Sequence, residues 1–283
     1  MTEQARKLRN LINKGEHFVV ADAYSALTGR IVESVGFKAA YLGGHACSAF
    51  HYALPDNGIF SQVEQIEQAA RIATAINIPL IADADTLGET TADAFHFTRR
   101  YMRAGIAGFH IEDEVNPKHS TWANGLIAIA DMQVRIDACK RAREGSDLVI
   151  IARCDEMYLN SQRGGGGGSI EAAKRRGLAY AEAGADALVF PRAAPEVTQE
   201  LARAMPIPLC TLGSDVAGTA FTLSTGWGWL GAAQLHLSRA RELMQTGMVK
   251  MDPVLEGKDE LLEQPLYDAL TRGWAERTGR KTR

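Results

Sequence analysis

Acidic side chains recur where short apolar runs of the sequence end: Asp56, Asp83, Asp85, Glu112, Asp113 and Asp155. Any one of them could be a helix cap or an exposed loop charge. Asp83 and Asp85 alternate along one run, so both side chains point the same way. Carboxylates gathered on one face repel one another, and a hard divalent cation relieves that repulsion. The pattern predicts a Mg²⁺ site, which Mn²⁺ could also fill.

Two basic side chains accompany these carboxylates. His110 lies two residues before Glu112 and shares its face, either as a satisfied core histidine or as a substrate contact. Arg153 ends another apolar run, where it could pair with a carboxylate of the protein or of a ligand. The sequence leaves both choices open.

The alternation of strands and helices predicts how these residues are positioned. Short apolar runs alternate with amphipathic stretches of about 10 to 15 residues, as in βαβ units. Eight alternations favour one closed (β/α)8 barrel over residues 1–283, which brings the strand ends to one face. The strands are expected at 18–22, 39–43, 79–83, 108–112, 148–153, 187–191, 208–212 and 231–237.

Several segments depart from this rhythm. A helical tail is expected from about residue 249, packed on the barrel or on another subunit. The five glycines at 164–168 predict a mobile loop, because glycine loses much backbone entropy on ordering. The loop at 116–125 follows a predicted metal-ligand strand and is a candidate lid.

Composition narrows the class of protein. The 283 residues are 46% hydrophobic and 23% charged, with a net charge of −3. This balance offers no basic stripe for nucleic acid and no polybasic anchor for a membrane. The first 18 residues lack the apolar core of a signal peptide, so a cytoplasmic protein is expected. The four cysteines show no C-x-x-C spacing and are expected to be reduced.

Five motifs together resemble the isocitrate lyase and phosphoenolpyruvate mutase superfamily. They are YLGG at 41–44, LPDNG at 54–58, ADADT at 82–86, GFHIED at 108–113 and IARCD at 151–155. The resemblance implies a (β/α)8 barrel whose last helix is exchanged between subunits of a homodimer or homotetramer. It also implies that Asp83, Asp85 and Glu112 hold Mg²⁺, with Asp56 reaching it through water.

The resemblance further implies a bound 2-oxo or 2-hydroxy acid that chelates the metal. Backbone amides around Gly43 and Gly44, together with Arg153, would hold its carboxylate. His45 and His110 are further candidate substrate contacts. The shared chemistry is cleavage of a bond at C3 through a metal-bound enolate.

The catalytic loop departs from the family pattern. Lyase members carry a Lys-Lys-Cys-Gly-His or Lys-Arg-Cys-Gly-His loop, whose cysteine protonates the departing carbanion. Here residues 116–122 read NPKHSTW, so Lys118 matches the lysine while Ser120 replaces the cysteine and Trp122 the histidine. A serine hydroxyl is a much weaker proton donor than a thiol. Tyr41 and His119 are the better candidates for an acid or base.

Two further positions differ from the family pattern, and they could contact the part of the substrate that does not bind the metal. Arg192 stands where tricarboxylate lyases present a glutamate, and Thr211 stands near their asparagine. Arg192 could meet an extra anionic group of the substrate, although arginine is usually a surface residue. We expect both positions to contact substrate.

These features favour a Mg²⁺-dependent carbon–carbon lyase that acts on a 2-oxo or 2-hydroxy di- or tricarboxylate, by decarboxylation or retro-aldol cleavage. Decarboxylation needs no proton donor to a departing carbanion, so it tolerates the altered loop. One alternative is an enzyme of the phosphonate branch, which breaks or moves a C–P bond. Another is a non-catalytic paralogue that only binds the metabolite.

Overall fold

Eight parallel strands close into a barrel, in the order in which they follow along the chain. The computed structural model describes residues 3–119, 125–158, 168–251 and 253–279. The strands are β1 Phe18–Asp22, β2 Ala40–Leu42, β3 Leu80–Asp83, β4 Gly108–Glu112, β5 Val149–Arg153, β6 Ala187–Val189, β7 Leu209–Leu212 and β8 Phe221–Ser224. The closed parallel barrel confirms the predicted fold class.

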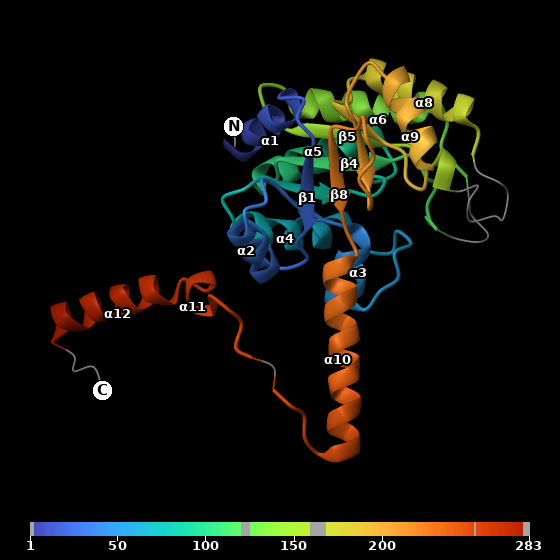
Figure 1. The fold of residues 1–283 in the computed structure, drawn as a ribbon. Helices are drawn as coiled ribbons and strands as arrows, with labels where there is room; N and C mark the ends of the chain where they lie inside the picture. The colour runs from blue at the N-terminus through green and yellow to red at the C-terminus, as the bar shows by residue number, and fades with distance from the viewer. Residues whose placement is uncertain (1–2, 120–124, 159–167, 252, 280–283) are drawn as a thin grey trace. The chain divides into compact units, whose positions relative to one another are not determined.

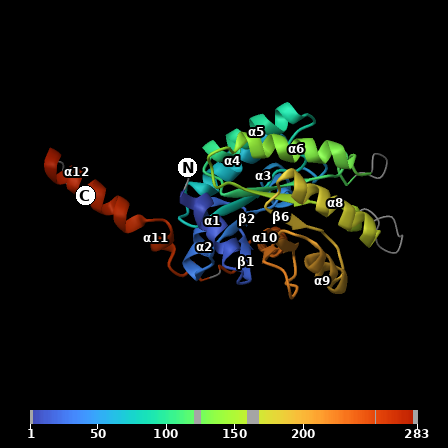
Figure 2. The ribbon, with the colours of Figure 1, turned by 90° about the horizontal axis from the view of Figure 1, so that it is seen from above.

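Helices surround the strands of the barrel (Figures 1 and 2). They are α1 Glu3–Asn13, α2 Ala26–Val35, α3 Gly44–Tyr52, α4 Gln62–Ala73, α5 Thr91–Arg103, α6 Ile129–Ala142, α8 Ile170–Ala183 and α9 Pro195–Ala204. Capping boxes at Ser25, Ser61 and Thr90 satisfy the free amides that begin α2, α4 and α5. At the C-terminus of α8, Gly184 adopts the left-handed conformation that commonly ends a helix at a glycine.

Two apolar clusters hold the barrel together. One fills the interior with side chains such as Val20, Ile81 and Phe221, and the other lies between the strands and the helices. Leu8 and Ile12 of α1 belong to the interior cluster, and Leu8 lies against Gly108 at the start of β4. Helix α1 therefore closes the N-terminal end of the barrel, so the opposite, C-terminal end is the one open to ligands.

The expected strand at 231–237 is wrong. Those residues lie in helix α10, Trp227–Thr246, and the eighth strand is Phe221–Ser224. Segment 231–237 contains alanine, leucine and glutamine, which are strong helix formers, and no β-branched residue. In β8, by contrast, Phe221 and Leu223 alternate with Thr222 and face the barrel interior.

The chain divides into two compact units, Met1–Ala233 and Gln234–Arg283. The second contains the rest of α10, followed by α11 Lys258–Leu261 and α12 Gln264–Thr278. Within the described residues, no helix combines the length and the apolar character needed to cross a membrane. The predicted mobile loop at 164–168 lies outside the described residues except for Gly168.

Candidate metal centre and cavity

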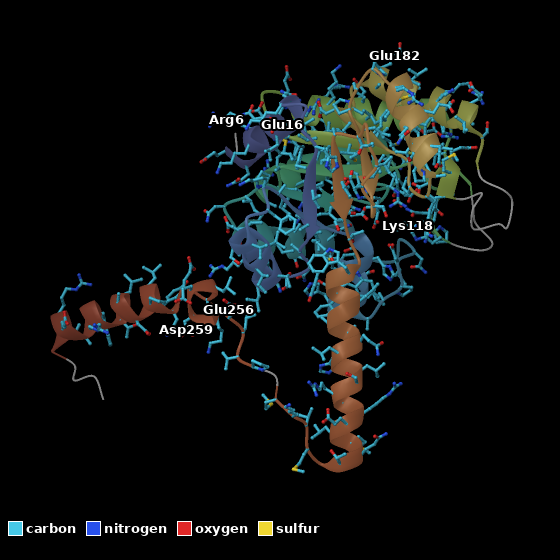
Figure 3. All side chains as sticks on the ribbon, viewed as in Figure 1. Arg6, Glu16, Lys118, Glu182, Glu256 and Asp259 are labelled. Carbon is cyan, nitrogen blue, oxygen red and sulfur yellow. The ribbon has the colours of Figure 1, made fainter. Side chains whose placement is uncertain are left out.

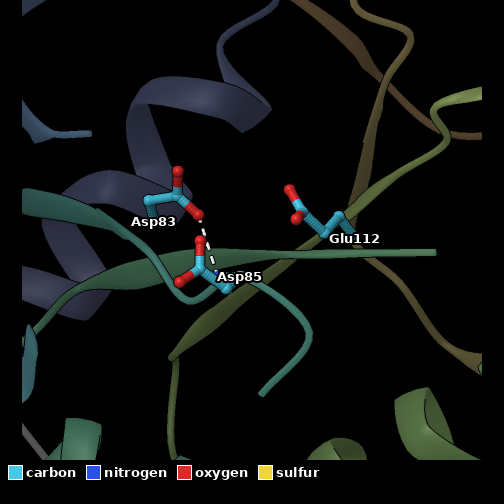
Figure 4. A group of neighbouring side chains, drawn as sticks. All are labelled: Asp83, Asp85 and Glu112. Carbon is cyan, nitrogen blue, oxygen red and sulfur yellow. Dashed lines mark hydrogen bonds between the residues drawn. The ribbon is translucent and has the colours of Figure 1, made fainter. Parts of the chain in front are cut away.

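Three carboxylates meet at the C-terminal ends of β3 and β4 (Figure 4). Asp83 ends β3, Asp85 follows two residues later, and Glu112 ends β4. One oxygen from each lies within 4.8 Å of the others, and all three residues are buried. The barrel thus brings together the three residues that the alternating acidic pattern suggests as metal ligands.

Backbone amides fix the orientation of Asp83. Its Oδ1 accepts a hydrogen bond from the amide of Asp85 at 2.9 Å, and its Oδ2 accepts one from the amide of Gly44 at 3.0 Å. A Cβ atom on Gly44 would stand 2.9 Å from Asp83 Oδ2 and 3.1 Å from Asp85 Oδ1. Only glycine permits this close approach of α3 to the carboxylates.

Lys118 reaches into the same cluster. Labelled in Figure 3, it is fully buried, and its Nζ lies 2.9 Å from Asp56 Oδ1 and 3.4 Å from Glu112 Oε1. It also forms a very short ion pair with Asp85. The sequence suggests Lys118 as a catalytic residue, and the structure shows it as the ammonium that balances the carboxylates.

Arg153 forms a second cationic contact with the cluster. Its Nη1 lies 2.8 Å from Glu112 Oε2, while Nε and Nη2 donate to both oxygens of Asp155. This bidentate geometry is the one that a guanidinium favours with a carboxylate. Of the two interpretations open for Arg153, the structure shows pairing with carboxylates of the protein.

The chemistry of the cluster fits a divalent cation. Burial raises the pKa of Asp85 to about 7; Lys118 opposes the rise, whereas the charges of Asp83, Glu112 and Asp56 add to it. Glu112 meets Lys118 and Arg153 as ion pairs, yet neither of its oxygens accepts a hydrogen bond among the described residues. The cluster therefore offers hard oxygen donors that remain short of positive charge, as Mg²⁺ or Mn²⁺ requires.

A hydrogen-bonded pair links Asp83 to the cavity. The Tyr41 hydroxyl lies 2.8 Å from His110 Nε2, and His110 Nδ1 lies 3.5 Å from Asp83 Oδ1. Burial, together with the charge of Asp83, raises the pKa of Tyr41 well above its usual range. Burial lowers the pKa of His110. At neutral pH the pair is a neutral phenol beside a neutral imidazole.

A cavity of about 260 Å³ opens beside the carboxylates. Nine of the predicted site residues line it: Tyr41, Gly43, Gly44, His45, Asp56, Asp83, His119, Arg153 and Arg192. His119 Nδ1 lies 2.8 Å from the carbonyl oxygen of Asp56, and its Nε2 lies 3.3 Å from Glu114 Oε2. Both ring nitrogens of His119 therefore face oxygen atoms of the protein.

Other predicted residues lie away from the cavity. The Thr211 hydroxyl contacts Thr222 Oγ1 at 2.8 Å, and its neighbour Leu212 lines the cavity instead. Cys210 and Phe221 face the barrel interior. Because successive side chains of a strand point to opposite faces, Thr211 faces away from the interior. The expectation that Thr211 contacts substrate finds no support in its position. Ser120 and Trp122 lie outside the described residues.

Asp113 also turns away from the metal centre. Its Oδ2 accepts hydrogen bonds from the Tyr180 hydroxyl at 2.6 Å and from Arg176 at 3.2 Å, both on α8. Its Oδ1 accepts the amide of Asp155 at 2.9 Å. Asp113 follows Glu112 directly, so it points to the opposite face and joins the strand ends to α8.

Sequence reasoning misses several residues of the cavity wall. Tyr158, Thr225, Trp229 and Leu230 line the cavity, and the last two belong to α10. Trp229 contacts the ring of His45 edge-on, with centroids 4.8 Å apart. An aromatic-rich segment after the last strand is the sequence feature that could indicate these wall residues. The expected strand at 231–237 overlaps the helix that follows this segment, so the feature is not used.

The fold and the site agree with comparisons to known proteins. The family model for phosphoenolpyruvate phosphomutase matches residues 8–226. The chain belongs to this family. The match confirms the predicted membership of the isocitrate lyase and phosphoenolpyruvate mutase superfamily.

Relatives of this family member have several different activities. The chain is 34% identical over 217 residues to the 2,3-dimethylmalate lyase of Eubacterium barkeri, covering 76% of this chain and 72% of that protein. It is 33% identical over 211 residues to the 2-methylisocitrate lyase of Bacillus subtilis (strain 168), covering 73% and 66%. The structure of a phosphoenolpyruvate phosphomutase from Streptomyces platensis subsp. rosaceus matches with a TM-score of 0.85 at 24% identity, covering 96% and 100%. That last similarity supports the fold.

Proposed function

We propose that this protein is a Mg²⁺-dependent carbon–carbon lyase that acts on a 2-oxo or 2-hydroxy di- or tricarboxylate. The observation that carries the proposal is the buried set of Asp83, Asp85 and Glu112 beside a cavity that Tyr41 lines. The similarity to 2,3-dimethylmalate lyase and 2-methylisocitrate lyase supports the same reaction class.

Asp83, Asp85 and Glu112 would hold the cation, and Asp56 would lie close enough to bind its waters. When bound, Mg²⁺ supplies Lewis-acid polarisation of the substrate oxygen at C2 and a template for its carboxylate. Mn²⁺, which accepts the same oxygen donors, could replace it. Lys118 also pairs with carboxylates of this cluster. Its ammonium would neutralise part of the negative charge that remains after a divalent cation has bound.

Tyr41 and His110 would move the proton of a 2-hydroxy substrate. With the Nδ1 proton of His110 facing Asp83, Nε2 accepts the hydrogen bond of Tyr41, which leaves the lone pairs of Tyr41 for the substrate. The substrate hydroxyl passes its proton to Tyr41 Oη as Tyr41 passes its own to His110 Nε2. The C2 oxygen becomes a carbonyl, and the electron pair of the C2–C3 bond goes to C3.

The carbon released in such a cleavage needs a proton. His119 lines the cavity, but both of its ring nitrogens face protein oxygens. Decarboxylation of a 2-oxo acid releases CO₂ and leaves the electron pair as an enolate, which takes up a proton at C3 to become the product 2-oxo acid. In both reactions His119 or water would supply this proton, but the enolate of the decarboxylation can wait for a proton from water after CO₂ has left.

The test is release of a 2-oxo acid from oxaloacetate, 2,3-dimethylmalate, 2-methylisocitrate, isocitrate and phosphonopyruvate, with Mg²⁺ and with EDTA. We expect turnover of a carbon acid that EDTA abolishes, that Asp83→Ala loses and that Asp137→Ala, a change at an exposed position on α6, retains. Consumption of phosphonopyruvate alone would instead identify the phosphonate branch. Silence across the panel despite tight Mg²⁺ binding would favour the binding paralogue.

We further propose a homo-oligomer, either a dimer or a tetramer. Helices α10 and α12 expose large apolar side chains, which in soluble proteins mark interaction surfaces: Leu235, Leu237, Leu243, Leu266, Tyr267, Leu270 and Trp274. Light scattering coupled to size-exclusion chromatography would measure the mass, and a mass of one chain would contradict the proposal.

A further inference from the structure

Arg192 is an arginine of the cavity that no carboxylate of the described residues neutralises. It follows β6, lines the cavity and is exposed. Within residues 3–119, 125–158, 168–251 and 253–279, no carboxylate lies within 4 Å of the Arg192 guanidinium. The guanidinium of Arg153, by contrast, forms ion pairs with Glu112 and Asp155. Arg153 is thus paired twice, whereas no described carboxylate pairs with Arg192.

The backbone and a neighbouring ring hold Arg192 at this place. Its φ is 63°, in the left-handed region, which costs a residue with a side chain about 1 kcal/mol. Its guanidinium carbon lies 5.7 Å from the centroid of the Tyr158 ring, and that of Arg153 lies 6.0 Å from the same ring. Both guanidinium groups therefore lie over the same aromatic ring, whose π system offers each of them a weak attraction.

The cavity that Arg192 lines also has apolar wall residues. They include Pro191, which precedes Arg192 in the chain, and Leu212, Trp229 and Leu230. A cation in a partly apolar cavity, with no carboxylate of the described residues paired to it, suits an anionic group on a short alkyl chain. A planar carboxylate would meet the guanidinium in the bidentate geometry that arginine favours.

We propose that Arg192 binds a carboxylate on the C3 substituent of the substrate, so that the protein prefers a tricarboxylate to the matching dicarboxylate. This inference rests on the proposed lyase function and names the substrate class within it. Two probes separate the classes: 2-methylisocitrate carries a CH₂COO⁻ group on C3 where 2,3-dimethylmalate carries a methyl group. Cleavage of either between C2 and C3 releases pyruvate, with succinate or propionate as the other product.

The experiment compares kcat/KM for both probes in the wild type, Arg192→Met, Arg192→Lys and Arg203→Met. Arg203, an exposed residue of α9, controls for loss of a positive charge away from the cavity. We expect Arg192→Met to lower kcat/KM for 2-methylisocitrate by about 10- to 100-fold, as for a lost charged hydrogen bond, through KM more than kcat. We expect 2,3-dimethylmalate to change less than about 3-fold and Arg192→Lys to recover part of the loss.

Thermal unfolding checks that the variants fold, and because methionine keeps a side chain at the same φ, its melting temperature should match the wild type. A wild type that prefers 2,3-dimethylmalate, or a ratio unchanged in Arg192→Met, would overturn the inference while leaving the lyase function in place. EDTA-sensitive release of a 2-oxo acid from oxaloacetate, with neither probe consumed, would do the same. Absence of such release from every carbon acid would overturn the lyase function itself.

Discussion

The two ends of the cavity are built differently. At the metal end, Asp83 and Glu112 are the last residues of neighbouring strands, and backbone amides orient Asp83. At the outer end, Arg192 stands on a connecting segment with left-handed backbone, and Trp229 belongs to α10. Strand ends hold ligands rigidly, whereas segments between elements tolerate change. The metal end would therefore supply the chemistry, and the outer end would choose the substrate.

Tyr41→Phe tests the metal end most severely. Without the hydroxyl, His110 has no group through which to take a substrate proton. We expect kcat for a 2-hydroxy substrate to fall by about 10²- to 10⁴-fold, the usual contribution of a positioned acid or base, with little change in KM. Tyr52→Phe, which removes a hydroxyl that accepts a hydrogen bond from Gln68, is the control. Equal activity in the two variants would remove Tyr41 from the mechanism.

Lys118→Met distinguishes the contribution of the Lys118 ammonium to stability from that of a bound metal ion. Three carboxylates would lose their cation, which we expect to lower the free energy of unfolding in EDTA by about 3 to 5 kcal/mol. Saturating Mg²⁺ should restore part of that loss, because the cation binds the same oxygens. Urea unfolding with and without Mg²⁺ measures both, and Lys174→Met, on a surface pair, should cost under about 1 kcal/mol. A loss that Mg²⁺ does not relieve would place the cation elsewhere.

Asp22 lies against the start of α10, the helix that carries Trp229 at the outer end of the cavity. Burial raises its pKa to about 6, against the opposing amides of Gly226, Trp229 and Gly228 at the start of α10. Because the folded pKa exceeds the unfolded value near 3.8, the folded state binds more protons between these values. The contribution of Asp22 to stability is present below pH 4 and is lost as pH rises through 6, by at most about 3 kcal/mol.

Asp22→Asn should abolish this dependence. We expect the difference in unfolding free energy between pH 4 and pH 8 to differ between wild type and variant by up to that amount, with the variant gaining relative stability at pH 8. Urea unfolding at several pH values measures it. Parallel curves for the two proteins would show that Asp22 does not change its protonation on folding in this range.

Gly44→Ala is expected to have the smallest effect. The new Cβ would press on Asp83 Oδ2 and displace a ligand by a few tenths of an ångström. We expect Mg²⁺ affinity to fall by about 10-fold, as for loss of a group that orients a ligand. Gly231→Ala, where a Cβ meets nothing within 4 Å, should leave the affinity unchanged. Equal affinities in the two variants would mean that the close approach at Gly44 is not required.

The same division explains what the sequence could predict. Seven of the eight strands follow from apolar runs, because strands buried on both faces leave that signal. The carboxylates at their ends follow with them. The sequence pattern misplaces the eighth strand, because Phe221–Ser224 is only four residues long and the helix after it is also apolar.

Contacts between distant segments left no such signal. The sequence could not show that Lys118 enters the carboxylate cluster, that Asp113 turns to Tyr180, or that Trp229 reaches His45. These depend on the path of loops and on which face a single residue takes. Arg192 stands out in the sequence because its charge departs from the family pattern, but only the structure shows that no carboxylate of the described residues pairs with it.

Binding of Mn²⁺, followed by electron paramagnetic resonance, tests the metal centre most directly. The account predicts one tight Mn²⁺ per chain, displaced by Mg²⁺, with affinity weakened by at least about 10²-fold in Asp85→Asn and unchanged in Asp137→Asn. The isosteric change removes one charged ligand oxygen and leaves the shape of the site. Equal Mn²⁺ affinity in the wild type and Asp85→Asn would contradict the assignment of the metal centre.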